Sequence, residues 1–139
     1  MFLCITEKKY NVIHLGGCIL IMKPIFPKVN TGLNIVIVGG GKIGVALIEQ
    51  LTAEGHDITI IDNNPVRIQT ITDMYDIMGI AGNGASYGIQ MEAGIENADL
   101  IIAVTGSDEL NLLCCTVASQ VGNCASIARV RTPDYSKEA

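Results

Sequence analysis

The sequence lacks several features that would indicate particular classes of protein. Only 17% of its 139 residues are charged, and 14 acidic residues outnumber 9 basic ones, which gives a net charge of -5. A surface that neutralises a phosphate backbone needs the opposite sign, which argues against nucleic acid as a partner. The apolar stretch Val12–Met22 is interrupted by His14 and by glycines. It also falls short of the roughly 20 apolar residues that span a bilayer.

Groups of residues with known chemistry are missing as well. The cysteines are odd in number and contain no Cys-x-x-Cys pair, so they indicate neither a zinc site nor a disulfide framework and fit a reducing cytosol. They are Cys4, Cys18, Cys114, Cys115 and Cys124. We find no Tyr-x-x-x-Lys pair and no Ser/His/Asp set. His14 falls in the N-terminal stretch and His56 in a predicted turn at the amino end of the sheet, so we expect no enzyme.

What is present is a long alternation of two patterns that begins at Leu33. Short apolar runs rich in Ile and Val alternate with longer segments of helical spacing, which is typical of βαβ units on a parallel sheet. The predicted strands are Leu33–Val38, Asp57–Ile61, Ile77–Ala81, Leu100–Val104 and Ser126–Val130. The predicted helices are Ile43–Glu54, Pro65–Met74, Ser86–Ala93 and Glu109–Val121.

These elements predict an α/β protein with a Rossmann-like, doubly wound parallel sheet. Right-handed crossovers give the strand order 3-2-1-4-5 in a three-layer αβα arrangement, with a ligand crevice at the carboxyl ends of the first and fourth strands. We expect residues 33–135 to form this domain and residues 136–139 to be a tail. Residues 1–32 follow no such pattern, so we expect an accessory extension that is non-native or disordered, with Met22 as a candidate internal start.

A glycine motif joins the first strand to the first helix. The motif Gly-x-Gly-x-x-Gly is formed by Gly39, Gly41 and Gly44. The first glycine permits a tight turn, the second lets the backbone approach a pyrophosphate, and the third lets helix and strand pack closely. The helix N-terminus favours an anion, and Lys42 either adds charge or lies in solvent. This context predicts a site for an adenine dinucleotide or a related nucleotide.

An acidic residue follows the second strand, where dinucleotide-binding domains have one for the ribose hydroxyls. Asp62 stands there, and its carboxylate would repel a 2′-phosphate and so favour NAD over NADP. Asp62 could instead only begin the turn that leads to Pro65. Arg67 could lie along the adenine or point to solvent.

Polar residues also follow the third and fourth strands. Asn83 lies in a glycine-rich turn and is either a contact for adenosine or a residue chosen for turn geometry. Thr105 and Gly106 could offer hydroxyl and backbone contacts to the nucleotide, whereas Asp108 could cap the fourth helix, with Asn111 in its first turn.

In these residues the chain resembles a known family, the N-terminal nucleotide-binding (KTN or RCK) domain of TrkA-type potassium uptake regulatory proteins. The resemblance covers roughly Asn34 to Tyr135. It is carried by Ile35–Gly44, Ile61-Asp62, Gly82–Gly84, Ala93–Asp99, Ala103–Thr105, Asp108–Asn111 and Ile127–Arg131. The family often has Asp and Thr where this chain has Asn83 and Ala85.

The resemblance implies a cytoplasmic, enzymatically silent domain that binds NAD(H) or ATP/ADP. It also implies a homodimer or higher homo-oligomer, peripheral at the inner face of the cell membrane, that gates a membrane-embedded potassium transporter subunit. Arg129 would lie near the phosphates or the subunit boundary. The candidate nucleotide-binding residues are therefore Gly39, Gly41, Lys42, Ile43, Gly44, Asp62, Asn63, Arg67, Asn83, Thr105, Gly106 and Arg129.

Two other classes share some of these features. The cofactor half of an NAD-dependent dehydrogenase would carry the same fingerprint, and fold analogy alone does not separate it from a regulator. A redox sensor that uses Cys114 and Cys115 would need a low thiol pKa. No basic residue stands near these cysteines in sequence, so we expect them to be small packing residues of a helix.

Overall fold

The structure of the chain is a computed structural model, and it describes residues 2–3, 11–15, 18–22 and 32–131. The predicted tail, residues 136–139, lies outside the described residues, as does the end of the predicted domain after Arg131.

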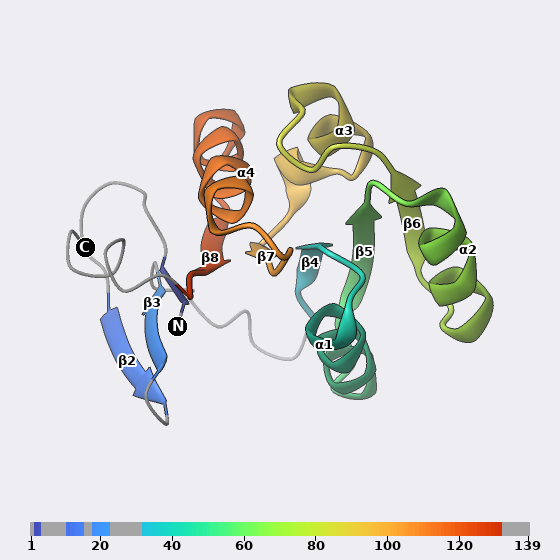
Figure 1. Cartoon of the computed structure of the whole chain (residues 1–139), viewed down its shortest axis with the longest axis horizontal. Coiled ribbons are helices and arrows are strands. Elements are labelled where there is room, and N and C mark those ends of the chain that lie inside the picture. The colour runs from blue at the N-terminus through green and yellow to red at the C-terminus, as the bar shows by residue number, and fades with distance from the viewer. Residues whose placement is uncertain (1, 4–10, 16–17, 23–31, 132–139) are drawn as a thin grey trace.

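A sheet of parallel strands forms the centre of the fold (Figure 1). Along the chain its strands are β4 (Asn34–Val38), β5 (Asp57–Asp62), β6 (Met78–Ala81), β7 (Leu100–Ala103) and β8 (Ala125–Arg129). Across the sheet they run β6, β5, β4, β7, β8, and each neighbouring pair is parallel. The predicted order 3-2-1-4-5 is confirmed.

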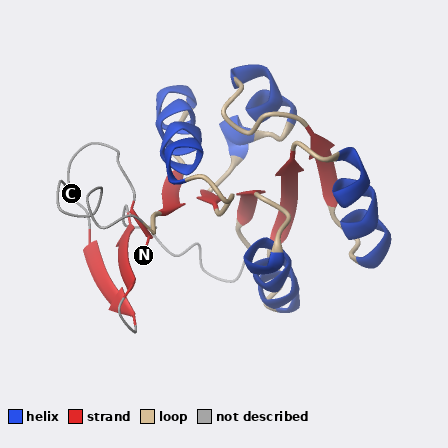
Figure 2. Ribbon diagram, viewed as in Figure 1, coloured by secondary structure: helices blue, strands red, loops and turns tan. Residues whose placement is uncertain are grey.

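Helices cover both faces of this sheet, as Figure 2 shows. They are α1 (Lys42–Ala53), α2 (Pro65–Met74), α3 (Tyr87–Glu92) and α4 (Asp108–Val121), with a short 3-10 helix, η1 (Ile95–Asn97), before β7. The first two helices pack on one face, and the other elements pack on the opposite face. The three-layer arrangement is confirmed, and each predicted boundary lies within one residue of the observed one.

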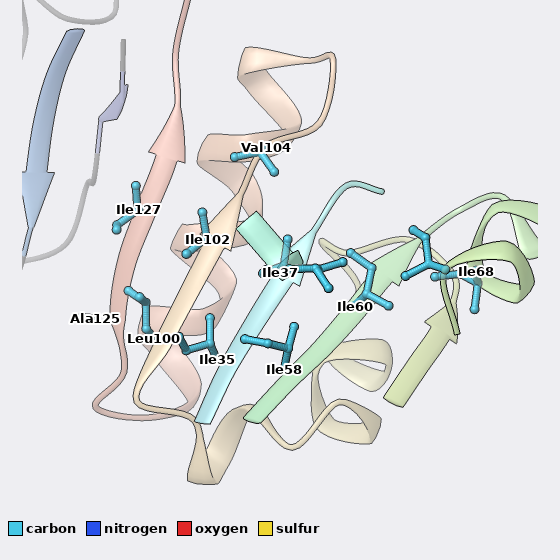
Figure 3. Close-up of a cluster of buried hydrophobic side chains, with 12 residues drawn as sticks. Ile35, Ile37, Ile58, Ile60, Ile68, Leu100, Ile102, Val104, Ala125 and Ile127 are labelled. Atoms are coloured by element: carbon cyan, nitrogen blue, oxygen red, sulfur yellow. The ribbon is translucent and has the colours of Figure 1, made fainter. Parts of the chain in front are cut away.

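Burial on both faces explains the composition of the central strands. In β4 all residues after Asn34 are buried, and they alternate between the two apolar clusters. Ile35 and Ile37 lie in the cluster beneath α1 and α2, with Ile58, Ile60 and Ile102 from neighbouring strands (Figure 3). Strands of a parallel sheet read as continuous apolar runs because helices cover both sides.

Apolar spacing in α1 predicts a buried stripe of Ile43, Ala46, Leu47 and Leu51. Three of these residues pack against the core, whereas Ala46 is exposed, and the fully buried residues of the helix are Gly44 and Ile48. Gly44 is buried because it packs against the bend that precedes the helix. An ideal Cβ on Gly44 would lie 1.8 Å from the carbonyl oxygen of Gly39, so only glycine fits this contact.

The buried stripe of α4 is also not the obvious apolar one. Leu113 is 52% exposed, although it lies on the most apolar part of the helix. The residues that α4 buries are Asp108, Asn111, Cys114, Cys115 and Ala118. A stripe of polar and small residues is buried because its polar members, Asp108 and Asn111, bind neighbouring segments of backbone.

The N-terminal residues add strands that the sequence analysis did not predict. β1 (Phe2–Leu3) pairs antiparallel with the outer edge of β8, which extends the sheet to six strands. β2 (Asn11–Leu15) and β3 (Cys18–Met22) pair with each other as an antiparallel hairpin beside this end of the sheet (Figure 1).

Candidate nucleotide-binding site

A cavity of about 790 Å³ opens at the carboxyl edge of the sheet. Equivalent ends of the central strands meet there, because Val38 pairs with Ile61 on one side and with Ala103 on the other. All the candidate nucleotide-binding residues except Gly44 line this cavity. The structure therefore brings together side chains that lie far apart in the sequence.

The segment Gly39–Gly44, which we call the glycine bend, has the shape that the motif predicts. Gly39 has a φ of +110°, a conformation that favours glycine, and a Cβ there would lie 2.9 Å from the backbone nitrogen of Thr105. Gly44 does not line the cavity, because it packs against the bend itself. Nothing lies within 4 Å of the Cβ position of Gly41, so the space in front of this residue is open toward the cavity.

The N-terminus of α1 faces this open space. Its N-cap is Gly41, which has no side chain to accept from the N–H groups of the first turn, and that turn contains no acidic residue. Uncapped N–H groups and the positive end of the helix dipole together favour an anion. Lys42 and Ile43 of the same turn line the cavity, and Lys42 is exposed.

Asp62 is the acidic residue at the end of β5, and it is only 6% exposed. One carboxylate oxygen accepts from the Gly40 nitrogen at 2.8 Å, and the other accepts from the Asn64 nitrogen at 2.8 Å. The residue therefore does begin the turn toward α2, and it also fixes the glycine bend. Because an ionised carboxylate has about four acceptor positions, it retains capacity for a further donor.

Arg67 lines the cavity and forms an ion pair with Asp62. Its guanidinium donates from Nη1 to the Asp62 carboxylate at 3.3 Å, although its side chain is 49% exposed. Its aliphatic stem packs over Gly40, where an added Cβ would lie 3.1 Å from the Arg67 Cδ. Arg67 and Asn63 both line the cavity beside Asp62.

The turn after β6 forms the wall of the cavity near Asn83. The Asn83 side-chain oxygen accepts from the Ala85 nitrogen at 2.9 Å, and its carbonyl accepts from the Ser86 nitrogen. The turn-geometry interpretation is thus confirmed, while the side chain still lines the cavity. Gly84 is buried beneath it, and a Cβ there would lie 2.3 Å from Val38 Cγ1.

The loop between β7 and α4 forms the opposite wall. Thr105 lines the cavity, but its hydroxyl lies 2.6 Å from the Asn111 Oδ1 and within reach of the Ser107 carbonyl, so the loop itself uses this group. The predicted cap at Asp108 is wrong, because the N-cap is Ser107, whose hydroxyl accepts from the Leu110 nitrogen at 3.1 Å. The hydroxyl of Ser107 reaches a free N–H of the first turn, whereas Asp108 is already the first helical residue.

Asp108, at the start of α4, instead binds the segment that follows β8. It is 6% exposed, and one of its oxygens accepts from the Arg131 nitrogen at 3.0 Å. The Arg131 side chain approaches the same carboxylate at 3.8 Å and donates to the Gly106 carbonyl. These contacts tie the cavity-lining residue Gly106 to the segment that follows Arg129, which also lines the cavity.

Several residues that line the cavity were not predicted from the sequence. They are Val38, Ile61, Gly82, Gly84, Val104, Ser107 and Leu110. All of them except Leu110 are next to a predicted site residue in sequence, at the carboxyl end of a strand or in the turn that follows it. Extending each predicted contact to its sequence neighbours would have found these residues, whereas Leu110 lies within the first turn of α4.

The remaining candidates for chemistry do not line this cavity. Burial raises the pKa of the Cys114 thiol from 9.0 to about 12, the reverse of what a redox-active cysteine needs. Cys114 and Cys115 are both 0% exposed, which confirms them as packing residues. His56 lies just before β5, at the amino end of the sheet, where its Nδ1 accepts from the Leu33 nitrogen at 2.9 Å.

Neither a metal site nor a membrane span emerges in the described part of the chain. No group of three or more potential ligands there is placed to hold a metal ion. None of its helices combines the length and the hydropathy needed to cross a bilayer.

Comparisons with known proteins agree with this geometry. The TrkA-N domain family matches residues 35–139. The Trk system potassium uptake protein TrkA of Vibrio alginolyticus is 39% identical over 107 residues, which are 76% of this chain and 23% of that protein. The chain thus spans less than a quarter of the length of that relative.

Solved structures share the fold at low identity. The NAD(P)-binding domain of an exopolyphosphatase-related protein from Archaeoglobus fulgidus superposes with a TM-score of 0.68 at 21% identity, over 76% of this chain and 79% of that one. The GsuK channel bound to NAD gives 0.60 at 20% identity, over 71% of this chain and 18% of the channel. The match of the family over most of the sequence decides the assignment: the chain belongs to the TrkA-N domain family.

Proposed function

We propose that this chain is a regulatory domain of a potassium transport system and that it binds an adenine nucleotide, NAD(H) or ADP/ATP. The observation that carries the nucleotide site is the cavity at the carboxyl edge of the sheet. It combines an open glycine bend, an uncapped helix N-terminus and a buried carboxylate. Family membership supports the transport role.

The diphosphate of the nucleotide lies over the bend at the N-terminus of α1, where no side chain caps the N–H groups of the first turn. Lys42 and Arg129 add positive charge from two sides of the cavity. In this arrangement a chain with a net charge of -5 still offers a local site for an anion.

A ribose hydroxyl of the adenosine donates to Asp62, which retains acceptor capacity beside its bonds from Gly40, Asn64 and Arg67. The carboxylate disfavours a 2′-phosphate, and the ion pair with Arg67 weakens that effect. Asn83 stands on the same side of the cavity and contacts the adenosine. The site therefore favours NAD(H) and ADP/ATP over NADP.

The regulatory step needs two arrangements of paired domains. We infer a homodimer or higher homo-oligomer at the inner face of the cell membrane, where it contacts a membrane-embedded potassium transporter subunit. A nucleotide shifts the balance between arrangements only if it binds them with different affinities. The support is the potassium uptake named for the relative from Vibrio alginolyticus.

Calorimetric titration of the full chain with ADP, ATP, NAD, NADH and nicotinamide mononucleotide tests the binding step. A regulatory adenylate site binds ADP and NAD with affinities within about tenfold, because the shared diphosphate and adenosine make the contacts. The cofactor half of a dehydrogenase binds NAD far more tightly than ADP and also binds the mononucleotide, since it holds the nicotinamide. That second pattern, or hydride transfer, would overturn the proposal.

Small-angle scattering of the same samples tests the regulatory step. We expect ADP and NADH to produce distinguishable dimer geometries. Scattering that is the same with every nucleotide and without any nucleotide would show equal affinity for the arrangements and would refute gating by occupancy.

A further inference from the structure

Two side-chain amides are fully buried behind the walls of the nucleotide cavity. Gln90 in α3 and Asn111 in α4 are each 0% exposed, and neither lines the cavity itself. Buried polar side chains are retained where their hydrogen bonds are needed. The partners of these two amides therefore indicate their purpose.

Asn111 joins the loop after β7 to the end of β8 at the edge of the cavity. Its Oδ1 accepts from the Thr105 nitrogen at 2.8 Å and from the Thr105 hydroxyl at 2.6 Å. Its Nδ2 donates to the Thr105 carbonyl at 3.2 Å and to the Arg129 carbonyl at 2.8 Å. The amide thus uses both donors and both acceptor positions, and both residues that it binds line the cavity.

Gln90 joins the opposite wall to the same helix. Its Nε2 donates to the Gly84 carbonyl at 2.8 Å and to the Cys114 carbonyl of α4 at 2.9 Å. Gly84 lines the cavity next to Asn83. Within the described residues the buried Oε1 of Gln90 has no hydrogen-bond partner. Burying an unpaired oxygen costs free energy, and an apolar side chain would avoid that cost. The contribution of Gln90 is therefore its two hydrogen bonds to the Gly84 and Cys114 carbonyls.

We propose that Asn111 and Gln90 are positioning residues that hold the two walls of the nucleotide cavity against α4. This assignment rests on the proposed function and extends it to residues behind the site. Asn111 positions the wall that carries Arg129, which faces the phosphates. Gln90 positions the turn that carries Asn83, which faces the adenosine.

The two roles predict different losses when ADP and adenosine are titrated into the full chain by calorimetry. In Asn111→Asp the carboxylate cannot donate to the Arg129 and Thr105 carbonyls. The affinity for ADP then falls roughly tenfold, whereas that for adenosine changes less than about twofold. In Gln90→Met the adenosine wall moves, so both affinities fall by a similar factor, roughly three- to tenfold.

Matched controls separate these effects from general destabilisation. Asn97→Asp and Gln69→Met make the same chemical changes at exposed positions that do not line the cavity, and we expect both affinities to stay unchanged. If Asn111→Asp does not fold by circular dichroism, Asn111→Ser, which is smaller and uncharged, replaces it with the same expected pattern.

Unchanged affinities, or equal losses for ADP and adenosine in the variants of Asn111, would overturn the assignment of that residue. A Gln90→Met chain that binds both ligands like the unchanged chain would overturn the assignment of Gln90. A failure of the unchanged chain to bind ADP would instead refute the nucleotide site itself.

Discussion

At the scale of single residues, two glycines of one motif are constrained for different reasons. A Cβ on Gly44 would lie 1.8 Å from the Gly39 carbonyl oxygen, while a Cβ on Gly41 meets nothing within 4 Å. The first glycine is required by the protein's own packing. The second leaves space toward the cavity that a ligand can fill.

Substituting each glycine by alanine should separate these reasons. Helix propensity alone would make Gly44→Ala stabilising, but the backbone contact opposes it, and we expect a loss on the order of 3 kcal/mol in the free energy of unfolding. Gly41→Ala should change that free energy by less than about 0.5 kcal/mol. It should nevertheless weaken ADP binding roughly tenfold, because the new methyl group stands where the diphosphate approaches.

Urea titration and calorimetry of the two variants measure these quantities. Loss of stability in Gly41→Ala, or full ADP affinity despite it, would contradict the account of the bend.

The Cys114 thiol should make stability fall at high pH. Burial raises the pKa of the Cys114 thiol from 9.0 to about 12. Below pH 9 the Cys114 thiol keeps its proton in both the folded and the unfolded chain. Between pH 9 and about pH 12 only the unfolded chain loses this proton. The free energy of unfolding should therefore decrease through this window, by about 1.4 kcal/mol per pH unit for this group.

Urea titrations of the unchanged chain and of Cys114→Ala between pH 8 and 11 isolate this contribution, because the other titrating groups are common to both chains. The alanine variant should have the shallower dependence on pH. Equal slopes would show that burial does not hold the proton on this thiol.

At the scale of secondary structure, local signals predicted where each element begins and ends. The helix α2 begins as its sequence indicates, because Asn64 accepts from the Val66 nitrogen at 3.0 Å and Pro65 fills the first helical position. The helix α1 ends just before Gly55, whose φ of +87° is a conformation that favours glycine and that stops a helix. Such signals depend only on neighbouring residues, which is why they can be read without the structure.

The cap of α2 gives a direct test at this scale. Asn64→Ala removes the acceptor for two N–H groups and should cost about 1 kcal/mol in the free energy of unfolding. The neighbouring Asn63→Ala, at an exposed position outside the helix, should change it by less than about 0.5 kcal/mol. Thermal or urea unfolding compares them, and equal losses would argue against the cap.

Packing faces were harder to predict than boundaries. Leu113 lies in an apolar stretch of α4 but is exposed, whereas the helix buries Asp108 and Asn111. These two side chains are buried because they bind the Arg131 nitrogen and the Arg129 carbonyl. A polar side chain is buried only where a distant partner exists, and local spacing does not reveal that partner. The strands β1, β2 and β3 were missed because no alternation of elements marks them.

At the scale of the whole molecule, strand order determined the site. The carboxyl ends of β4, β5, β6, β7 and β8 meet at one edge, so residues identified from separate motifs come together around one cavity. The motifs predicted most of its lining, because each follows a strand. The roles of the positioning residues Asn111 and Gln90 were not predicted, since their hydrogen bonds depend on how α3 and α4 pack.

The central claim is that the glycine bend and Asp62 together hold an adenine nucleotide. A crystal structure of the full chain with ADP tests it most directly. We expect the diphosphate within hydrogen-bond distance of the N–H groups from Gly41 to Gly44, and a ribose hydroxyl on the Asp62 carboxylate. An ADP molecule bound elsewhere, or a bend that stays empty at saturating ADP, would contradict the account.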